Sequence, residues 1–212
     1  QAVEGSPIAA ALAFVEQEQV DVVMHEYGWP IGQFGDGSSE IEGLIDTLSQ
    51  TGQVHVTAAH NYAFDPMHAV ATVEGEQTLD FPIQVGTDFT VARYLYLSMR
   101  WRDAADPVGF TLALPDGSTF EVGPSSEDFW DGETNLSRSG ISTSSRGTKL
   151  AMFTLGRTDG VDWIPLVTGE AFLSVHTGPT DPVTIDLFVA DETGYLRGAA
   201  VVSHLALLTF VE

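Results

Sequence analysis

The chain has 212 residues, with 30 acidic and 8 basic side chains, a formal net charge of −22 and no cysteine. This charge repels nucleic acid and anionic membrane surfaces, and no apolar run reaches the roughly 20 residues that a membrane-spanning helix needs. The lack of cysteine excludes disulfides, thiolate–zinc sites and cysteine catalysis, while a hydrophobic content of 43% is sufficient for a folded core.

The charges are unevenly distributed along the chain. Residues 1–92 carry acidic side chains but no Lys or Arg, and Arg93 is the first base. Salt or calcium would screen this repulsion, which fits a saline or calcium-rich setting; a GC-rich genome, which favours Arg over Lys, is an open alternative. The chain begins at Gln1 without a signal peptide, so we expect a processed or excised segment of a secreted or cell-surface protein.

The first third of the chain predicts alternating helices and strands. Apolar residues recur at helical spacing in two stretches, and two short apolar runs are typical of strands buried on both faces. A Gly-rich loop precedes the second helix, which Ser38 or Ser39 can cap, with Glu42 placed as in a capping box. The order is typical of a parallel sheet covered by helices. The predicted elements are a helix over 7–19, a strand over 20–24, a helix over 40–51 and a strand over 53–59.

From residue 68 the hydrophobic period changes to two, which is typical of strands. Turn signals such as Pro115-Asp116-Gly117 and Thr158-Asp159-Gly160 separate the apolar segments. The stretch 124–147 is rich in Ser, Gly and acidic residues and is predicted to be a long surface loop. The predicted strands cover 68–74, 79–85, 92–101, 109–122 with its turn, 149–155, 162–167, 171–177, 183–190 and 200–211.

The predicted fold class is α+β. A short parallel α/β segment of two helices and two strands, residues 1–65, is followed by an antiparallel β-sandwich or jelly roll, residues 66–212. Two parallel strands cannot form a domain alone, because their edges and one face stay open. The α/β segment therefore either packs on the sandwich or belongs to a larger α/β domain supplied elsewhere.

The stretches VDVVMHEYGW (20–29) and GQVHVTAAHNYA (52–63), each following a predicted helix, resemble the middle of a subtilisin-like serine peptidase. In that family one strand ends in Ser-x-Gly, which lines the substrate cleft, and the next ends in Ala-Ala-Gly-Asn, whose Asn is the oxyanion donor. The resemblance implies that Gly28 lines the cleft and that Asn61 is that donor. Residues 68–212 resemble the β-rich insertion that some large bacterial subtilases carry after this Asn.

The chain departs from the family pattern in ways that matter chemically. Glu26 stands where the family has Ser, and His60 stands where it has Gly, so a side chain would fill the space left for substrate. The catalytic Asp and His precede this segment in the family and the nucleophilic Ser follows it, and no Gly-Thr-Ser-x-Ala-like stretch occurs here. The chain alone is therefore predicted to lack peptidase activity.

Glu26 and His60 follow two strands that we expect to be adjacent and parallel, at the edge where α/β sheets bind ligands. Such a pair can transfer protons or hold a metal; we favour a structural ion pair. His25 and His68 have no short ligand spacing with a second histidine, so no zinc site is assigned. Asn61, without a nucleophile in the chain, is favoured as a turn residue.

Acidic and aromatic residues in loop-like segments supply the other candidates. Clustered carboxylates can bind calcium, although solvated loops are favoured here. Aromatic rings in loops can stack on a ligand such as a sugar, although more often they attach a loop to the core. The calcium candidates are Asp103, Asp106, Asp128 and Asp131, and the aromatic candidates are Tyr27, Trp29, Phe34 and Trp130.

Three functions follow from these observations. The favoured one is a non-catalytic, secreted, subtilase-derived binding or assembly module, whose partner is a protein: a second copy or the remainder of a larger precursor. The second is a fragment of an active subtilisin-like endopeptidase whose triad lies outside this chain. The third is a carbohydrate-binding β-sandwich with an α/β cap. The full precursor sequence separates the first two, and glycan binding tests the third.

Overall fold

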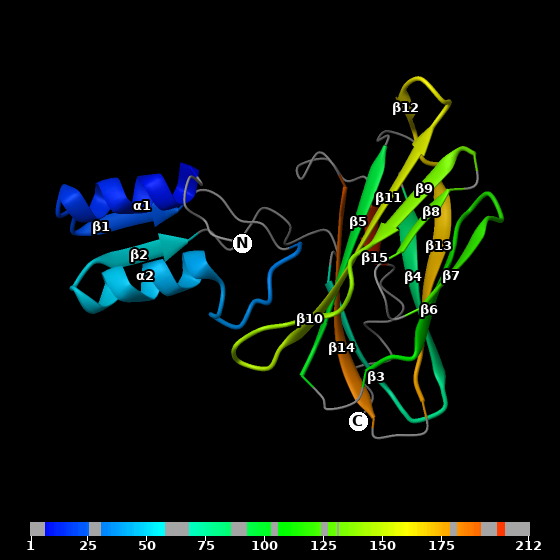
Figure 1. Ribbon diagram of the computed structural model, residues 1–212, viewed down its shortest axis with the longest axis horizontal. Helices are drawn as coiled ribbons and strands as arrows, with labels where there is room; N and C mark the ends of the chain where they lie inside the picture. Colours follow the sequence, from blue (N-terminus) through cyan, green and yellow to red (C-terminus); the bar gives the residue numbers. More distant parts are fainter. Residues whose placement is uncertain are drawn as a thin grey trace.

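The chain folds into a short α/β segment followed by antiparallel strands, which lie in two separate parts of the molecule (Figure 1). The computed structural model describes residues 7–25, 31–57, 68–85, 93–102, 106–123, 127–130, 132–178, 182–191 and 199–201. Most of the described chain is antiparallel sheet, and the two helices belong to the first part, so the fold class is α+β as predicted.

The α/β segment consists of α1 (Pro7–Gln17), β1 (Val22–His25), α2 (Glu40–Gln50) and β2 (Val54–Thr57). The two strands pair in parallel, from Val22↔Val54 to His25↔Thr57, so the predicted α-β-α-β order is confirmed. The predicted capping box is also present: the Ser39 hydroxyl accepts from the Glu42 amide, and the Glu42 carboxylate accepts from the Ser39 amide. Among the described residues, no helix has the length and apolar character that crossing a membrane requires.

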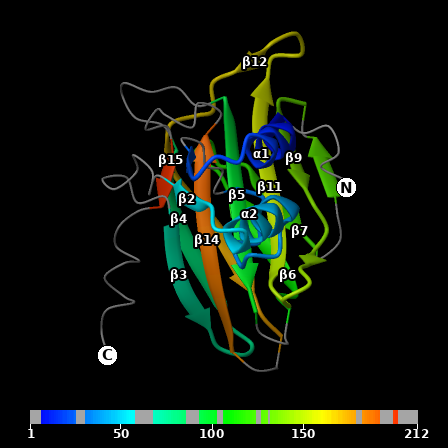
Figure 2. The same cartoon turned by 90° about the vertical axis from the view of Figure 1, so that its left-hand side faces the viewer.

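The prediction that both parallel strands are buried on both faces is wrong. The helices α1 and α2 contact each other on one side of the two-stranded sheet (Figure 2), and alternate strand residues face that side. The residues of the other face are exposed, because among the described residues both helices lie on the opposite side of the sheet. Their exposed fractions are 59% for Val22, 69% for Met24, 54% for Val54 and 46% for Val56.

The remaining strands form two antiparallel sheets. One has eight strands in the order β3-β14-β5-β11-β9-β8, with β10 and β12 also paired to β11; the other has the order β15-β4-β13-β6-β7. The strands are β3 (His68–Val73), β4 (Thr78–Val85), β5 (Tyr94–Trp101), β6 (Gly109–Ala113), β7 (Thr119–Val122), β8 (Glu127–Trp130), β9 (Thr134–Arg138), β10 (Ser142–Thr143), β11 (Lys149–Thr158), β12 (Trp163–Ile164), β13 (Gly169–His176), β14 (Val183–Asp191) and β15 (Ala199–Val201).

One hydrophobic core joins the two antiparallel sheets. Alternate residues of the central strands point into it, for example Leu95, Leu97 and Met99 of β5, which are fully buried. Phe110 of one sheet meets the edge of Phe153 of the other, with ring centroids 5.3 Å apart. The predicted period of two therefore marks the core face of these strands correctly.

The prediction of a long surface loop over 124–147 is wrong, because this stretch contains β8, β9 and β10. β9 pairs with both β8 and β11, so it is an interior strand of its sheet. Its buried positions alternate as in any strand, but two of the three, Thr134 and Arg138, are polar and only Leu136 is apolar. Because two of its three buried residues are polar, this strand shows no alternation of apolar and polar residues, and a hydrophobicity pattern does not predict it.

Candidate functional site

The edge of the parallel sheet where the sequence places its main candidates is only partly described. β1 ends at His25 and β2 at Thr57. The candidates that lie outside the described residues are Glu26, Tyr27, Gly28, Trp29, His60, Asn61, Asp103 and Asp131. Nothing in the described geometry tests the roles that the sequence gives them.

A histidine pair lies immediately before this edge, on the face covered by the helices. His25 Nε2 lies 2.8 Å from His55 Nδ1, and the two rings stack with centroids 5.1 Å apart. Burial, and then the neighbouring His55, lower the pKa of His25 from its ordinary value. The described residues contain no group of three or more potential metal ligands. The lowered pKa favours the neutral form of His25, which can then share a hydrogen bond with His55.

His68 lies apart from this pair, in β3 at the edge of the eight-stranded sheet. Its Nε2 lies 3.1 Å from Asp186 Oδ1, and its ring stacks on Phe188, with centroids 4.2 Å apart. The structure therefore does not bring His68 to the end of the parallel sheet.

The Gly-rich loop between β1 and α2 reaches the outer face of the eight-stranded sheet. Ile31 is buried there, with 1% of its surface exposed, and the Gly32 amide donates to the Ser98 hydroxyl of β5 over 3.4 Å. Gly32 has a positive φ of 73°, and a Cβ at this position would lie 2.7 Å from Met152 Sδ. Glycine therefore lets the loop lie directly on the sheet.

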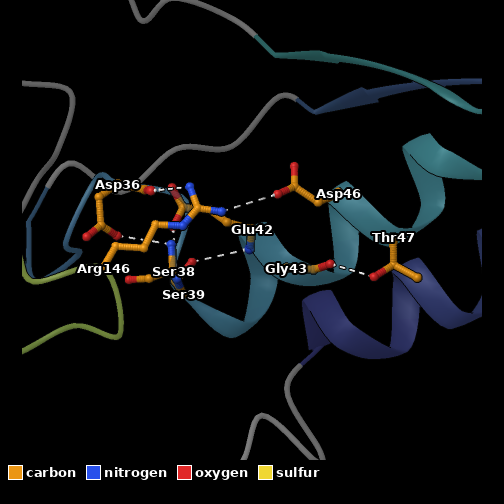
Figure 3. Close-up of polar contacts among 8 residues, drawn as sticks. All are labelled: Asp36, Ser38, Ser39, Glu42, Gly43, Asp46, Thr47 and Arg146. Carbon is orange, nitrogen blue, oxygen red and sulfur yellow. Dashed lines mark hydrogen bonds and ion pairs between the residues drawn. The ribbon is translucent and has the colours of Figure 1, made fainter.

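Asp36 anchors this loop to the turn between β10 and β11. Its carboxylate accepts hydrogen bonds from the Ser144 hydroxyl (2.6 Å) and the Ser38 amide (3.0 Å), while its carbonyl oxygen accepts from Arg146 Nη1 (2.7 Å). Figure 3 shows Arg146 between Asp36 and Asp46 of α2. Arg146 thus bridges the α/β segment and the antiparallel part of the chain.

The electrostatics of Asp36 follow from these contacts. Desolvation would raise the pKa of its carboxyl, but hydrogen bonds from Ser144, Ser38 and Thr148 outweigh it and hold the pKa well below the ordinary value. The group is therefore ionised at every pH at which the protein is expected to work.

A cleft of about 450 Å³ opens beside this anchor, between the loop and the end of the central strands. Its lining combines cationic, aromatic and hydroxyl-bearing side chains. We name it the arginine cleft and define it by its lining residues: Phe34, Gly35, Arg100, Trp101, Arg102, Thr148, Thr184, Asp186 and Phe188.

Arg100 is held in one position by its neighbours in the arginine cleft. Its guanidinium carbon lies 4.1 Å from the centre of the Phe188 ring, a cation–π contact. Asp186 is its direct neighbour on β14. Burial lowers the pKa of the Arg100 guanidinium, while the negative charges of Asp186, Glu42 and Asp36 act in the opposite direction. The guanidinium stays protonated at neutral pH.

The remaining described candidates have ordinary structural settings. Asp106 accepts hydrogen bonds from Lys149 Nζ (2.7 Å) and Trp101 Nε1 (3.1 Å). Asp128 is exposed in β8, and Trp130 is the last residue of that strand. Phe34 lies in the arginine cleft.

Sequence reasoning named Phe34 but missed the rest of the arginine cleft. Arg100 and Arg102 are two residues apart, so they lie on the same side of an extended strand. Two bases at this spacing, in a chain with eight bases in all, were the signal available. Their neighbour Asp186 comes from a strand far along the chain, and only the strand pairing brings it here.

Comparison with known proteins gives a match in structure only. No protein-family model matches the chain, and no curated protein matches it by sequence. The structure of the Clostridium perfringens CspB protease matches it with a TM-score of 0.66 at 15% sequence identity, over 86% of this chain and 38% of the protease chain. The Bacillus licheniformis lipase BlEst2 in propeptide form matches at 8% identity over 70% of this chain and 27% of the lipase chain, and its TM-score of 0.37 is too low to indicate a shared fold.

The match to the protease indicates a fold related to part of that protein. At 15% identity the match concerns the fold alone, which it indicates to be subtilase-like, and it tests none of the residue assignments within 20–29 and 52–63. The chain spans 38% of the length of the protease that it matches.

Proposed function

We propose that this chain is a subtilase-related portion of a larger protein. In this proposal its α/β segment contributes two strands and two helices to a subtilisin-like domain, and its antiparallel part is a β-sandwich attached to that domain. The observation that carries the proposal is the uncovered apolar face of the parallel sheet, formed by Val22, Met24, Val54 and Val56.

A parallel sheet normally has helices on both faces, because its strands are apolar on both sides. Here the helices cover one face, and valine and methionine side chains on the other remain about half or more exposed. The sheet has two strands, so both of its outer edges are also unpaired among the described residues. Further strands and a helical layer from the same larger protein would satisfy both deficiencies.

The strand order supports a jelly roll for the antiparallel part. Successive strands alternate between the sheets: β3 and β5 belong to one sheet, while β4 and β6 belong to the other. The two central orders are β3-β14-β5-β11 and β4-β13-β6-β7. β3 pairs with β14 and β4 pairs with β13, so early strands of this part pair with late ones. Two interlocked Greek keys produce this arrangement. β8 and β9 then extend one sheet at its edge.

The peptidase chemistry itself would lie outside this chain. A nucleophilic serine needs a base and an oxyanion hole, and the resemblance supplies Asn61 alone from that set. The chain on its own should therefore neither cleave casein nor react with a fluorophosphonate probe. Labelling of any serine in the chain would contradict this assignment.

A second candidate, a non-catalytic binding or assembly module, is favoured by the two departures from the family pattern. Glu26 adds a carboxylate and His60 adds a ring at positions where a peptidase needs space for its substrate. The two candidates differ in the sequence that surrounds this segment. An Asp and a His segment before it and a Gly-Thr-Ser-x-Ala-like segment after it would support an active peptidase, and substituted triad positions would support the module.

The uncovered face provides a direct structural test, because the chain has no cysteine of its own. A cysteine introduced by Val56→Cys should react rapidly with a maleimide in this chain and be protected in the longer protein. Val161→Cys, at a side chain that is 89% exposed, is the matched control and should react in both. Equal reactivity of Val56→Cys in both proteins would contradict the proposal.

A further inference from the structure

The arginine cleft is a local concentration of positive charge in a strongly acidic chain. Eight bases are available to balance 30 acids, and Arg100 and Arg102 both line this one cleft, with Asp186 as the only carboxylate among the described lining residues. We propose that the arginine cleft binds the carboxylate of a ligand whose neighbouring group is apolar, such as the free C-terminus of a peptide that ends in an aromatic residue.

Arg102 is positioned to receive the carboxylate. Its Nε donates to the buried Thr148 hydroxyl over 2.9 Å, which fixes the plane of the guanidinium, and among the described residues it has no ion-pair partner. The planar guanidinium matches the two oxygens of a carboxylate, so two parallel hydrogen bonds can form. A compact ammonium group would not give this geometry.

Arg100 supports this interaction through its charge. It is packed between the Phe188 ring and Gly35, where a Cβ would clash with Nη1 of Arg100. Asp186 faces it across the strand pair and also contacts His68. The described lining therefore holds two guanidinium groups and one carboxylate, and the charges of Asp36 and Glu42 act on Arg100 from outside the lining. Asp36, Glu42 and Asp186 lie around Arg100, so Arg102 is the group that we assign to the ligand carboxylate.

The other walls of the cleft define the rest of the ligand. Phe34 and Phe188 are partly exposed and offer apolar surface, while Thr184 is an exposed hydroxyl. A cleft of about 450 Å³ is within the range that holds a small organic ligand. The net charge of −22 repels polyanions at long range, so one carboxylate beside an apolar group fits better than a nucleotide or a sulfated polymer.

The source of such a carboxylate can be a peptide C-terminus or a small free acid, and paired probes distinguish these sources. N-acetylphenylalanine and a tetrapeptide ending in phenylalanine are each compared with their C-terminal amides by amide NMR titration of the whole chain. Each free acid should bind about tenfold or more tightly than its amide, because only the acid forms charge-assisted hydrogen bonds. Tighter binding of the tetrapeptide than of the single residue indicates a peptide; equal binding indicates a small acid.

Matched variants locate the binding. Arg102→Gln removes the charge at an exposed position and should weaken binding of the acids about tenfold, with the amide spectrum away from the cleft unchanged. Arg157→Gln removes a base at the opposite end of β11, roughly 25 Å from Lys149 along the strand, and should leave the affinity unchanged.

Three outcomes would overturn the inference: equal affinity for acid and amide, full affinity in Arg102→Gln, or no binding of any probe at ~10 mM, where ligands of this size normally bind a suitable cleft. Binding of glucose and glucuronate in place of the peptides would indicate a carbohydrate site instead. None of these results depends on proteolysis, so the inference can fail while the proposed function stands.

Discussion

Asp36 connects two parts of the chain through both its side chain and its main chain. The carboxylate is bound to Ser144 and the carbonyl oxygen to Arg146, both in the turn that precedes β11. A buried charge held by several donors is costly to leave without them. Asp36 therefore helps to attach the α/β segment to the antiparallel sheets, beside the Gly32–Ser98 and Arg146–Asp46 contacts.

Replacing Asp36 tests this attachment. Asp36→Ala removes a buried acceptor and leaves the Ser144 hydroxyl without its partner, which should cost about 1–3 kcal/mol. Urea denaturation measures the loss, and faster amide exchange in residues 31–38 locates it. Asp128→Ala, at an exposed carboxylate in β8, is the control and should change the free energy of unfolding by less than about 0.5 kcal/mol. Similar losses in both variants would contradict the anchoring role.

The pH dependence of the anchor has a definite sign. The folded-state pKa of Asp36 is held below its ordinary value of 3.8 by hydrogen bonds. The stabilisation is therefore fully present above that value and is lost as the pH falls below it, because protonation removes the acceptor. Thermal unfolding followed from pH 6 to pH 2 should show this loss, and Ser144→Ala should reduce it.

His25 gives a second pH dependence, in a different window. Its folded-state pKa is lowered from the ordinary 6.5 by burial and by His55. Below pH 6.5 the unfolded chain takes up a proton more readily than the folded chain, so stability should fall as the pH decreases through and below this value. His25→Gln should remove that part of the pH dependence, measured by amide exchange in α1 and β1, whereas His176→Gln should retain it.

At the level of elements, the sequence predicts those helices and strands whose conformation depends on residues close together in the chain. The capping box of Ser39 and Glu42 and the apolar face of α2 are signals within one helix, and the helix forms between the expected residues. β5 and β14 follow the period of two. β9 was missed because Thr134 and Arg138 take buried positions that a hydrophobicity pattern assigns to loops. Its partners β8 and β11 decide its conformation, and pairing between strands has no signal in a single stretch of sequence.

The candidate site divides in the same way. Glu26 and His60 follow from a family resemblance, which depends on short stretches of the chain. The arginine cleft depends on a loop, two strands and a turn that are far apart in sequence: Phe34, Arg100, Asp186 and Thr148 come together only through the sheet order. Patterns within one segment cannot predict such an arrangement.

The two faces of the parallel sheet should respond differently to substitution. Val56→Thr acts on a side chain that is already 46% exposed and should change stability by less than about 0.5 kcal/mol. Leu48→Ala, on the buried side of α2, should cost about 2–5 kcal/mol. Amide exchange in α2 and β2 at low protein concentration measures both. A cost for Val56→Thr as large as that for Leu48→Ala would mean that another part of the protein covers this face.

At the scale of the whole molecule, charge opposes compactness and association. The described elements before residue 58 contain acidic side chains but no Lys or Arg. Among the described residues, Arg146 and Arg100 of the antiparallel part lie close enough to offset some of this repulsion. Added cations should stabilise the chain. We expect molar salt or millimolar calcium to raise the melting temperature by roughly 2–4 °C, which corresponds to about 1 kcal/mol at this size. An unchanged melting temperature in both conditions would contradict this.

The same cations should promote association of the isolated chain. The uncovered face of β1 and β2 presents four apolar side chains next to unpaired strand edges, which is the surface that soluble proteins usually cover. At low salt a net charge of −22 keeps copies apart; when calcium or salt screens it, the apolar faces can meet. Edge-to-edge contacts between unlike surfaces need not close, so the products should be open chains of copies in addition to dimers.

Light scattering against protein concentration, with and without calcium, measures this association. The double variant Met24→Thr, Val56→Thr should abolish it, while Val161→Thr, at an exposed turn far from this face, should not. A chain that stays monomeric at high concentration in calcium would mean that its charge outweighs the exposed face under all conditions.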